Sequence, residues 1–439
     1  MIARFRKLVG YLSDAFWLLP GAMVVIGVVG AIVMLAIDRS GLVPQVLLEQ
    51  NWLYNGGGTG ARTLLGAVAS STIGVAGTVF SITIAALTLA AGQMGPRLLR
   101  NFVRDRGNQF TLGAFLGTFS YSLMVLRTVR DQDSTVFVPN LSLTVSILLA
   151  FLCVATLVYF VGHMAGRINV STVIGLVSDD ARLAIRRLTT DQPQPEAPPA
   201  SYWYNASVVL DSRHGYLQHL DAAGLADWAT EHGTAIRLLV RPGDYVLPGA
   251  PIALTRSPVA GAEEAIRDAT ALGNDRVSSE DFEYAIRQLV EIAVRALSPG
   301  INDPHTAMSV LDRLGLALSE VAPLHLPSGV TLRHGDVALV VPSSDYDGLV
   351  DVMFHLIRQN AKGSAAVLMH MLEVLTAVVG CEHDEQRVQA LQRHVDLILE
   401  DAERHVDTPS DLADLRERGR DFRTTREHGP LGRIGAMEC

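Results

Sequence analysis

The segment from Thr63 to Pro96 contains no charged residue, and small side chains recur along it at steps of three and four. That spacing places them on one face of a helix. A helix of about 27 residues, rising about 1.5 Å per residue, is long enough to cross a bilayer with some tilt. We call this stripe the small-residue face, and its members are Gly66, Ser70, Gly74, Gly77, Ser81, Ala85, Thr88 and Gly92.

A small-residue face inside a membrane has three interpretations. It allows another helix to pack closely, it lines a narrow polar path, or it borders a bound small molecule. The sequence leaves all three open, with close packing as the plainest of them. The residues that we carry forward as pore-lining or helix-packing candidates are Gly66, Ser70, Gly74, Gly77, Ser81 and Thr88.

Three further apolar segments, 16–37, 111–125 and 141–165, accompany this one. Each is near the length that a membrane helix needs, although the second is short unless it extends to Val129. The apolar run of the first is too long for a cleaved signal peptide. No comparable segment follows Arg167. The fold class that we predict is an α-helical membrane domain with four spans over residues 1–170, followed by a cytoplasmic α+β domain.

Basic residues near the span ends predict that both chain termini lie in the cytoplasm. Those on the predicted cytoplasmic side include Arg4, Arg6, Lys7, Arg97, Arg100, Arg104, Arg106 and Arg167. Among them, Arg97, Arg100 and Arg104 share one face of a short amphipathic helix that begins after Pro96. This helix either anchors the chain at the lipid headgroups or, in an oligomer, places a ring of Arg at the inner mouth of an anion pathway.

The cytoplasmic part divides into four predicted regions. Residues 171–200 form a helix, which extends the fourth span, and a proline-rich linker. Residues 201–256 alternate short strands and turns as a small β module, and 257–407 are mainly helical with a strand at 337–341. Residues 408–439 are polar and Arg-rich, and we expect a disordered tail there.

One loop of the helical region combines stop and start signals. Pro299 and Gly300 end one helix, and Asn302 or Asp303 caps the next, whose first turn contains Pro304. A helix-loop-helix corner is the plain interpretation. The functional alternative is that Asn302, Asp303 and His305 bind a ligand or form the junction with the membrane domain.

Catalytic sequence motifs are absent, so we do not predict an enzyme. The chain has no P-loop, no GxGxxG between a strand and a helix, no GxSxG and no HExxH. Cys381, His383 and Glu385 lie close in sequence but lack a second group at ligand spacing, so we expect no metal and no cofactor. His163, near the inner end of the fourth span, is expected to make an interfacial or cytosolic hydrogen bond rather than to serve as a proton relay. The net charge of −9 favours no nucleic-acid partner.

Three stretches carry a resemblance to a known family. They are GTVFSITIAALTLAAGQMGPRLLRNFVRDR (77–106), GYLQHLD (215–221) and RALSPGINDPHTA (295–307). In this order they resemble the bacterial predicted membrane proteins of the domain of unknown function 2254 family. The resemblance implies an inner-membrane protein with an N-terminal helical half and a cytoplasmic domain. It supplies no catalytic residues.

Two functions fit these observations. The first is a homo-oligomeric channel or conduit whose cytoplasmic domain assembles and gates it, with a small ion as the candidate permeant species. The alternative is a membrane-anchored sensor or scaffold whose cytoplasmic domain binds a protein or metabolite without transport. The expected partners are the lipid bilayer and further copies of the same chain.

Overall fold

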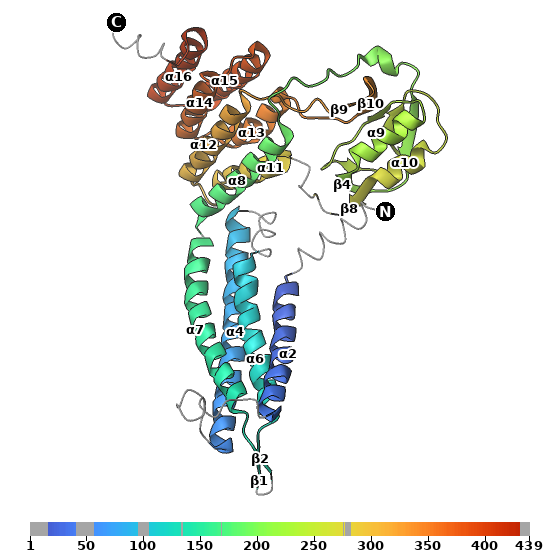
Figure 1. The fold of residues 1–439 in the computed structure, drawn as a ribbon. Helices are drawn as coiled ribbons and strands as arrows, with labels where there is room; N and C mark the ends of the chain where they lie inside the picture. Colours follow the sequence, from blue (N-terminus) through green and yellow to red (C-terminus); the bar gives the residue numbers. More distant parts are fainter. Residues whose placement is uncertain are drawn as a thin grey trace. The chain divides into compact units, whose positions relative to one another are not determined.

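The structure is a computed structural model that describes residues 16–40, 57–94, 105–132, 135–167, 169–274, 276 and 282–430. These residues form two compact units, divided in sequence between Asn169 and Val170. We call them the membrane unit and the C-terminal unit (Figure 1).

Within the described residues, the membrane unit has four helices that are long and apolar enough to cross a membrane. They are α2 (Leu18–Ser40), α4 (Gly58–Met94), α6 (Arg106–Leu126) and α7 (Asn140–Arg167). A short antiparallel hairpin of β1 (Arg130–Gln132) and β2 (Thr135–Phe137) connects α6 to α7. The third span is longer than the predicted segment 111–125, because Asp105 caps α6 by accepting a hydrogen bond from the Gly107 N–H.

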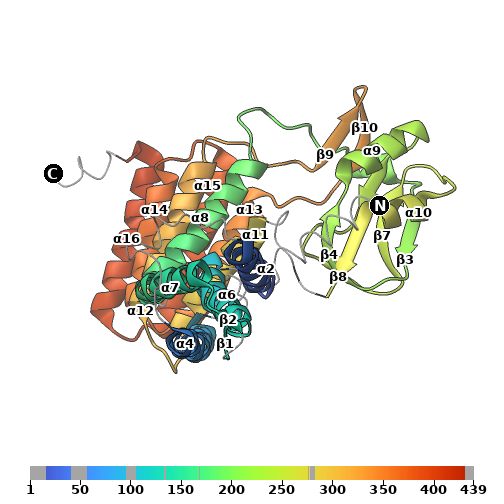
Figure 2. The same cartoon turned by 60° about the horizontal axis from the view of Figure 1, so that its bottom comes forward.

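Helix α6 is the most buried of the four and packs against α2, α4 and α7 (Figure 2). Glycine makes its contact with α2 close. A Cβ atom on Gly27 of α2 would overlap the carbonyl oxygen of Gly117, and a Cβ on Gly117 would lie 2.9 Å from the Met23 carbonyl oxygen. The two helices therefore meet backbone to backbone, as small residues permit in membranes.

Hydrogen bonds of polar side chains connect the helices of the same unit. Asp38, near the end of α2, accepts hydrogen bonds from the N–H groups of Leu141 (3.1 Å) and Ser142 (3.0 Å) and from the Ser142 hydroxyl (2.6 Å). It thereby satisfies N–H groups that the first turn of α7 leaves unpaired. Between α6 and α7, the Ser122 and Ser146 hydroxyls lie 2.8 Å apart. These bonds hold the helices in one register.

The C-terminal unit combines a helical bundle with two small sheets. The bundle helices are α8 (Val170–Leu188), α11 (Phe282–Ala296), α12 (Pro304–Val321), α13 (Tyr346–Asn360), α14 (Ala365–Val379), α15 (Glu385–His405) and α16 (Pro409–His428). The sheets and two further helices consist of β3 (Ser207–Asp211), β4 (Gly215–Leu220), α9 (Ala222–Glu231), β5 (Ile236–Leu238), β6 (Tyr245–Val246), β7 (Ala250–Thr255), α10 (Ala262–Ala269), β8 (Thr270–Gly273), β9 (Val330–Arg333) and β10 (Asp336–Val340).

The larger sheet has the strand order β3-β7-β5-β10-β9, and the smaller one has β6-β4-β8. Strand β10 runs parallel to β5, and the other pairings are antiparallel. Leu225 of α9 and Ile266 of α10 share a core with Ile236, Ile252 and Leu339 of the larger sheet. The sheets thus reach beyond the predicted β module over 201–256, because β8 and the β9–β10 hairpin join it from later in the chain.

Two helices differ from the sequence prediction. Helix α8 does not continue the fourth span: it belongs to the C-terminal unit and packs on α11 and α12, with Val173, Val177 and Ile185 buried. The predicted disordered tail begins instead with α16, which packs on α14 through Leu415 and Phe422. Because only a few apolar residues anchor this otherwise polar helix, its sequence pattern is weak. Residues 431–439 lie outside the described part of the chain.

Candidate functional site

The small-residue face lies on the side of α4 that the described residues of its own unit leave uncovered. Gly66 is half-buried, and Ser70, Gly74, Gly77, Ser81 and Thr88 are exposed. In the described part of the chain, no atom lies within 4 Å of the place where a Cβ on Gly66, Gly74 or Gly77 would sit. Packing among the described residues therefore does not explain why these side chains are small.

The opposite side of α4 is the buried one. Its residues are Ala61, Leu65, Ala69, Thr72, Ala76, Val79 and Ala86, all between 0% and 6% exposed. At about 100° per residue, the centre of this stripe lies about 170° from the centre of the small-residue face. Larger apolar side chains border the small-residue face, with Phe80 and Ile84 exposed on one side and Leu89 on the other. The uncovered face is thus a shallow strip between bulkier residues.

Two hydroxyls on this face donate hydrogen bonds within α4. Ser81 donates to the Gly77 carbonyl oxygen at 2.9 Å, and Thr88 donates to that of Ile84 at 2.9 Å. Each hydroxyl oxygen keeps lone pairs that point away from these bonds. The face consequently offers hydrogen-bond acceptors, without a charge, to whatever covers it.

The other predicted site on the membrane side cannot be placed. Arg97, Arg100 and Arg104 lie outside the described residues, so their assignment as an inner-mouth or lipid-facing basic group stays a prediction.

The corner at Asn302, Asp303 and His305 has a clear structural role. Asp303 caps α12 by accepting hydrogen bonds from the Thr306 N–H (3.1 Å) and hydroxyl (2.6 Å). These bonds hold the pKa of Asp303 below its usual range. Asn302 has a positive φ of 49°, a conformation that Asn tolerates, and both Asn302 and His305 are exposed. The geometry is that of the helix-loop-helix corner, and a ligand-binding role stays a prediction.

A buried charge network joins the sheet region of the C-terminal unit to its helical bundle. Glu283 of α11 is 2% exposed and accepts hydrogen bonds from Arg241 (2.7 Å), Arg287 (2.8 Å) and Ser344. Burial favours a higher pKa for Glu283, but the hydrogen bonds from Ser344 and Arg287 and the charge of Arg241 outweigh it and lower the pKa. No sequence motif indicates this group, because Arg241 and Ser344 lie 42 and 61 residues from Glu283.

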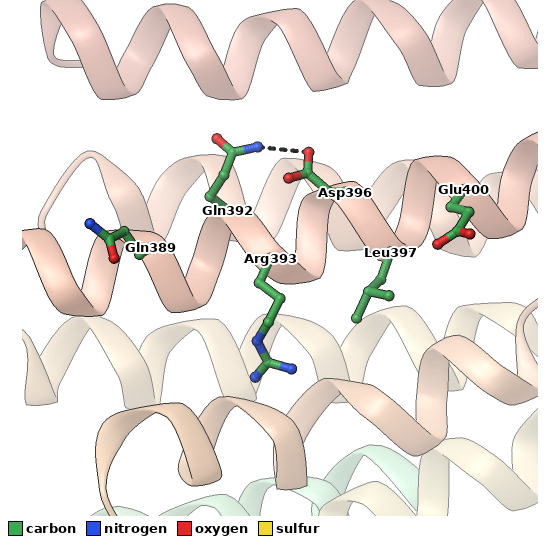
Figure 3. A pocket seen from close by; sticks show the side chains of 6 residues that line it. All are labelled: Gln389, Gln392, Arg393, Asp396, Leu397 and Glu400. Carbon is green, nitrogen blue, oxygen red and sulfur yellow. Dashed lines mark hydrogen bonds between the residues drawn. The ribbon is translucent and has the colours of Figure 1, made fainter.

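Two hollows open on the surface of the C-terminal unit. The first, of about 350 Å³, follows α15, where Gln392 donates to Asp396 and Arg393 turns toward the neighbouring helices (Figure 3). Arg393 pairs with Asp347 and Asp351 of α13. All the lining groups come from one helix, so they do not converge on a shared point.

The second hollow, of about 570 Å³, lies between α9 and α10. The indole of Trp228 stacks on His232 there, with ring centroids 4.1 Å apart, and Glu264 and Asp268 are exposed beside it. Across the described ranges, no group of three or more His, Cys, Asp or Glu side chains has the arrangement of a metal site.

Comparison with known proteins identifies relatives over nearly the whole chain. The uncharacterized proteins Rv1290c and MT1328 of Mycobacterium tuberculosis and Mb1321c of Mycobacterium bovis are each 32% identical to this chain over 435 residues. The match covers 94% of this chain and 81% of each relative. No solved structure matches it.

The family Predicted membrane protein (DUF2254) matches residues 13–377, a range that includes the four candidate spans and most of the C-terminal unit. The resemblance seen in the sequence is thereby confirmed. The chain belongs to this family of predicted membrane proteins.

Proposed function

We propose that the protein is a homo-oligomeric channel or conduit in the bacterial inner membrane, in which α4 of each copy turns its small-residue face toward a shared axis. The C-terminal unit is then cytoplasmic, as the distribution of Arg residues predicts, and serves for assembly and gating. Arg97, Arg100 and Arg104 follow α4 in sequence and would surround the inner mouth.

The observation that carries this proposal is the position of the small-residue face opposite the buried side of α4. The buried side fixes α4 to α6 and α7, where Ala76 and Val79 share a core with Phe115 and Cys153. Glycine costs about 1 kcal/mol relative to alanine in a helix interior. Because no described residue packs on these glycines, we attribute their small size to something outside the protomer. Close approach of other copies, or a narrow water-filled path, would require small side chains at these positions.

The chemistry of the face indicates the kind of solute. Hydroxyl oxygens such as those of Ser81 and Thr88 present lone pairs and no formal charge. Oxygen atoms replace part of the hydration shell of a cation in known selectivity filters. The uncharged oxygens of the face favour a small cation, whereas the Arg residues placed at the inner mouth favour an anion, so the permeant species in this proposal is a small ion of either sign.

Recordings from planar bilayers that contain the purified full-length protein test the proposal. In a cysteine-free background, Gly77→Cys places a thiol on the small-residue face, and Ile82→Cys places one on another side of α4 as the matched control. We expect a conductance that a water-soluble, positively charged thiol reagent reduces several-fold in Gly77→Cys and leaves unchanged in Ile82→Cys.

Two outcomes would contradict this expectation. Absence of any conductance would remove the transport function. If Gly77→Cys then forms disulfides between copies, the face is a packing surface, and the anchored sensor or scaffold becomes the better hypothesis.

A further inference from the structure

Three ionisable side chains lie in contact at the Asp105 end of the membrane unit. His163 of α7 places Nε2 2.6 Å from Oδ2 of Asp105 and Nδ1 3.5 Å from the Tyr159 hydroxyl. The Asp105 side chain is 5% exposed, that of His163 is 18% exposed, and Tyr159 is 51% exposed. The three groups therefore connect a buried carboxylate to the surface of the unit.

Glycine at position 107 makes this arrangement possible. A Cβ there would lie 2.7 Å from Nε2 of His163 and 3.0 Å from the Tyr159 hydroxyl. The carboxylate itself is held at the start of α6, where Oδ1 of Asp105 accepts from the Gly107 N–H at 3.1 Å. The N-terminus of a helix favours a negative charge, so the carboxylate and the imidazole are set in a fixed geometry.

Asn108, three residues after Asp105, adds an observation that the pair does not explain. It is 2% exposed, and neither its side-chain nitrogen nor its oxygen has a hydrogen-bond partner. Residues three apart are neighbours on a helix, and helical side chains lean toward the N-terminus. The amide of Asn108 therefore leans toward the turn that contains Asp105, and buried amides of this kind are almost always paired.

The unpaired atoms limit what can fill this place. A cation would satisfy the amide oxygen alone, and an anion would satisfy the amide nitrogen alone. A water molecule both donates and accepts, so it can pair with both atoms and bridge to a neighbouring polar group. Water is the occupant that leaves no buried donor or acceptor of Asn108 unsatisfied.

We propose that Asp105, Asn108 and His163 form a hydrated proton-binding site inside each protomer. One proton binds to the pair of carboxylate and neutral imidazole and converts it to carboxylate and imidazolium, so the charge of the pair changes from −1 to 0. Tyr159 and the water on Asn108 form the two ends of the path by which this proton enters and leaves. His163 makes a hydrogen bond, as its sequence position predicts, and we assign it the relay of a proton in addition.

The other helices of the unit bring few charges to this site. Helix α4 carries no charged residue from Thr63 to Met94, and Asp38 and Arg39 of α2 lie at the end where α7 begins. Arg106, next to Asp105, is exposed. Among the described residues, Asp105 and Tyr159 are the ionisable groups that contact the His163 imidazole.

The site is separate from the proposed conduit. Phe115, two turns after Asn108 on α6, packs against Ala76 and Val79 on the buried side of α4. Asn108 shares that side of α6. The proton-binding site therefore lies in the interior of one protomer and does not depend on the small-residue face.

Infrared difference spectra of the full-length protein in phosphatidylcholine vesicles, recorded between pH 5 and 8, test the proton-binding part. We expect imidazolium bands that are absent from His163→Gln. In Asp105→Asn, which keeps an N-cap side chain, these bands should shift in frequency, because the imidazolium loses the carboxylate that accepts its hydrogen bond. Identical spectra for the wild type and His163→Gln, or imidazolium bands at an unchanged frequency in Asp105→Asn, would overturn the proposal.

Asn108→Leu tests the hydration. If water pairs with Asn108, leucine removes its partner, and the midpoint of thermal unfolding falls. If the site holds no water, replacing an unpaired buried amide with leucine should stabilise the fold. An unchanged or higher midpoint of thermal unfolding would therefore overturn the proposed hydration. Ser120→Ala is the control on the same helix, because the Ser120 hydroxyl donates only to the Leu116 carbonyl oxygen of its own helix at 2.8 Å.

Discussion

Glycine occurs in two different settings in the membrane unit. Gly27 and Gly117 lie where α2 and α6 touch, with no room for a Cβ atom. Gly74 and Gly77 lie on α4 with nothing within 4 Å in the described residues. The same residue type therefore serves contact inside the protomer in one place and remains available to a partner in the other. The comparison teaches that small residues mark close approach, and that the structure is needed to say what approaches.

The C-terminal unit is held together differently. Buried charged and titratable groups connect its helices, as in the ion pair between Arg358 of α13 and Asp401 of α15. His394 of α15 is fully buried and lies 2.9 Å from Asp351 of α13. The stability of a unit whose helices are joined by buried titratable groups depends on pH, whereas the stability of a contact between glycine backbones does not. Four predictions test these differences.

Filling the glycine contact should have the largest effect. Gly27→Leu forces a side chain against the Gly117 carbonyl, and we expect it to lower the free energy of unfolding by about 3 kcal/mol or more. Gly30→Leu is the control on the same helix, since no described atom lies within 4 Å of a Cβ at Gly30. Chemical denaturation in detergent micelles measures both. Equal losses in the two variants would mean that Gly27 is not a contact residue.

Lowering the pH should have the second largest effect, a loss of stability of the C-terminal unit. Burial lowers the pKa of His394 to about 4, while in the unfolded chain it titrates near 6.5. The unfolded state thus binds more protons between these values, and stability falls as the pH falls through this window. From pH 6 to pH 4.5 we expect a loss of about 2 kcal/mol. Thermal unfolding across this range measures it.

The control for acid sensitivity is a matched pair of substitutions. His394→Gln removes the buried imidazole and should flatten the pH dependence, whereas His383→Gln, at an exposed position, should leave it unchanged. An equal slope in His394→Gln and the wild type would contradict the assignment to His394.

Loosening the polar fastening of α7 should have a moderate effect. Asp38→Ala removes the acceptor for two backbone N–H groups and the Ser142 hydroxyl, and we expect a loss of about 1.5 kcal/mol. Ser40→Ala removes a hydroxyl that donates within α2 and should change stability by less than about 0.5 kcal/mol. If the two variants unfold alike, Asp38 does not hold α7.

Substitution on the uncovered face should affect the protomer least. Gly74→Ala and Gly77→Ala each fit without a clash and should raise the free energy of unfolding by about 0.5–1 kcal/mol, because alanine favours the helix. If other copies cover this face, the same variants should weaken the oligomer, as native mass spectrometry measures. A destabilised protomer would show instead that the face is covered within its own chain.

Much of the fold was predictable because its signals are local. The apolar segments 16–37 and 141–165 correspond to α2 and α7, and the capping signals at Asp303 and Pro304 correctly start α12. The predicted segment 111–125 lacked the first turn of α6, since that turn is polar. Helix α16 was missed because its polar composition hides the anchors Leu415 and Phe422.

The candidate sites show a sharper division. The spacing of Ser70, Gly74, Gly77 and Ser81 predicted a shared face, but not that this face lies opposite the buried side of α4. Nothing in the sequence paired Asp105 with His163, 58 residues away, or Glu283 with Ser344.

By itself, the sequence determined that four apolar helices precede an α+β domain and which residues share the faces of those helices. Hydrophobic periodicity and capping act within a few turns, so they can be read along the chain. The tertiary structure alone decided which glycine is covered, which Asn is buried without a partner and which His meets a carboxylate. Those outcomes depend on contacts between helices far apart in sequence, and these exist only after the chain has packed.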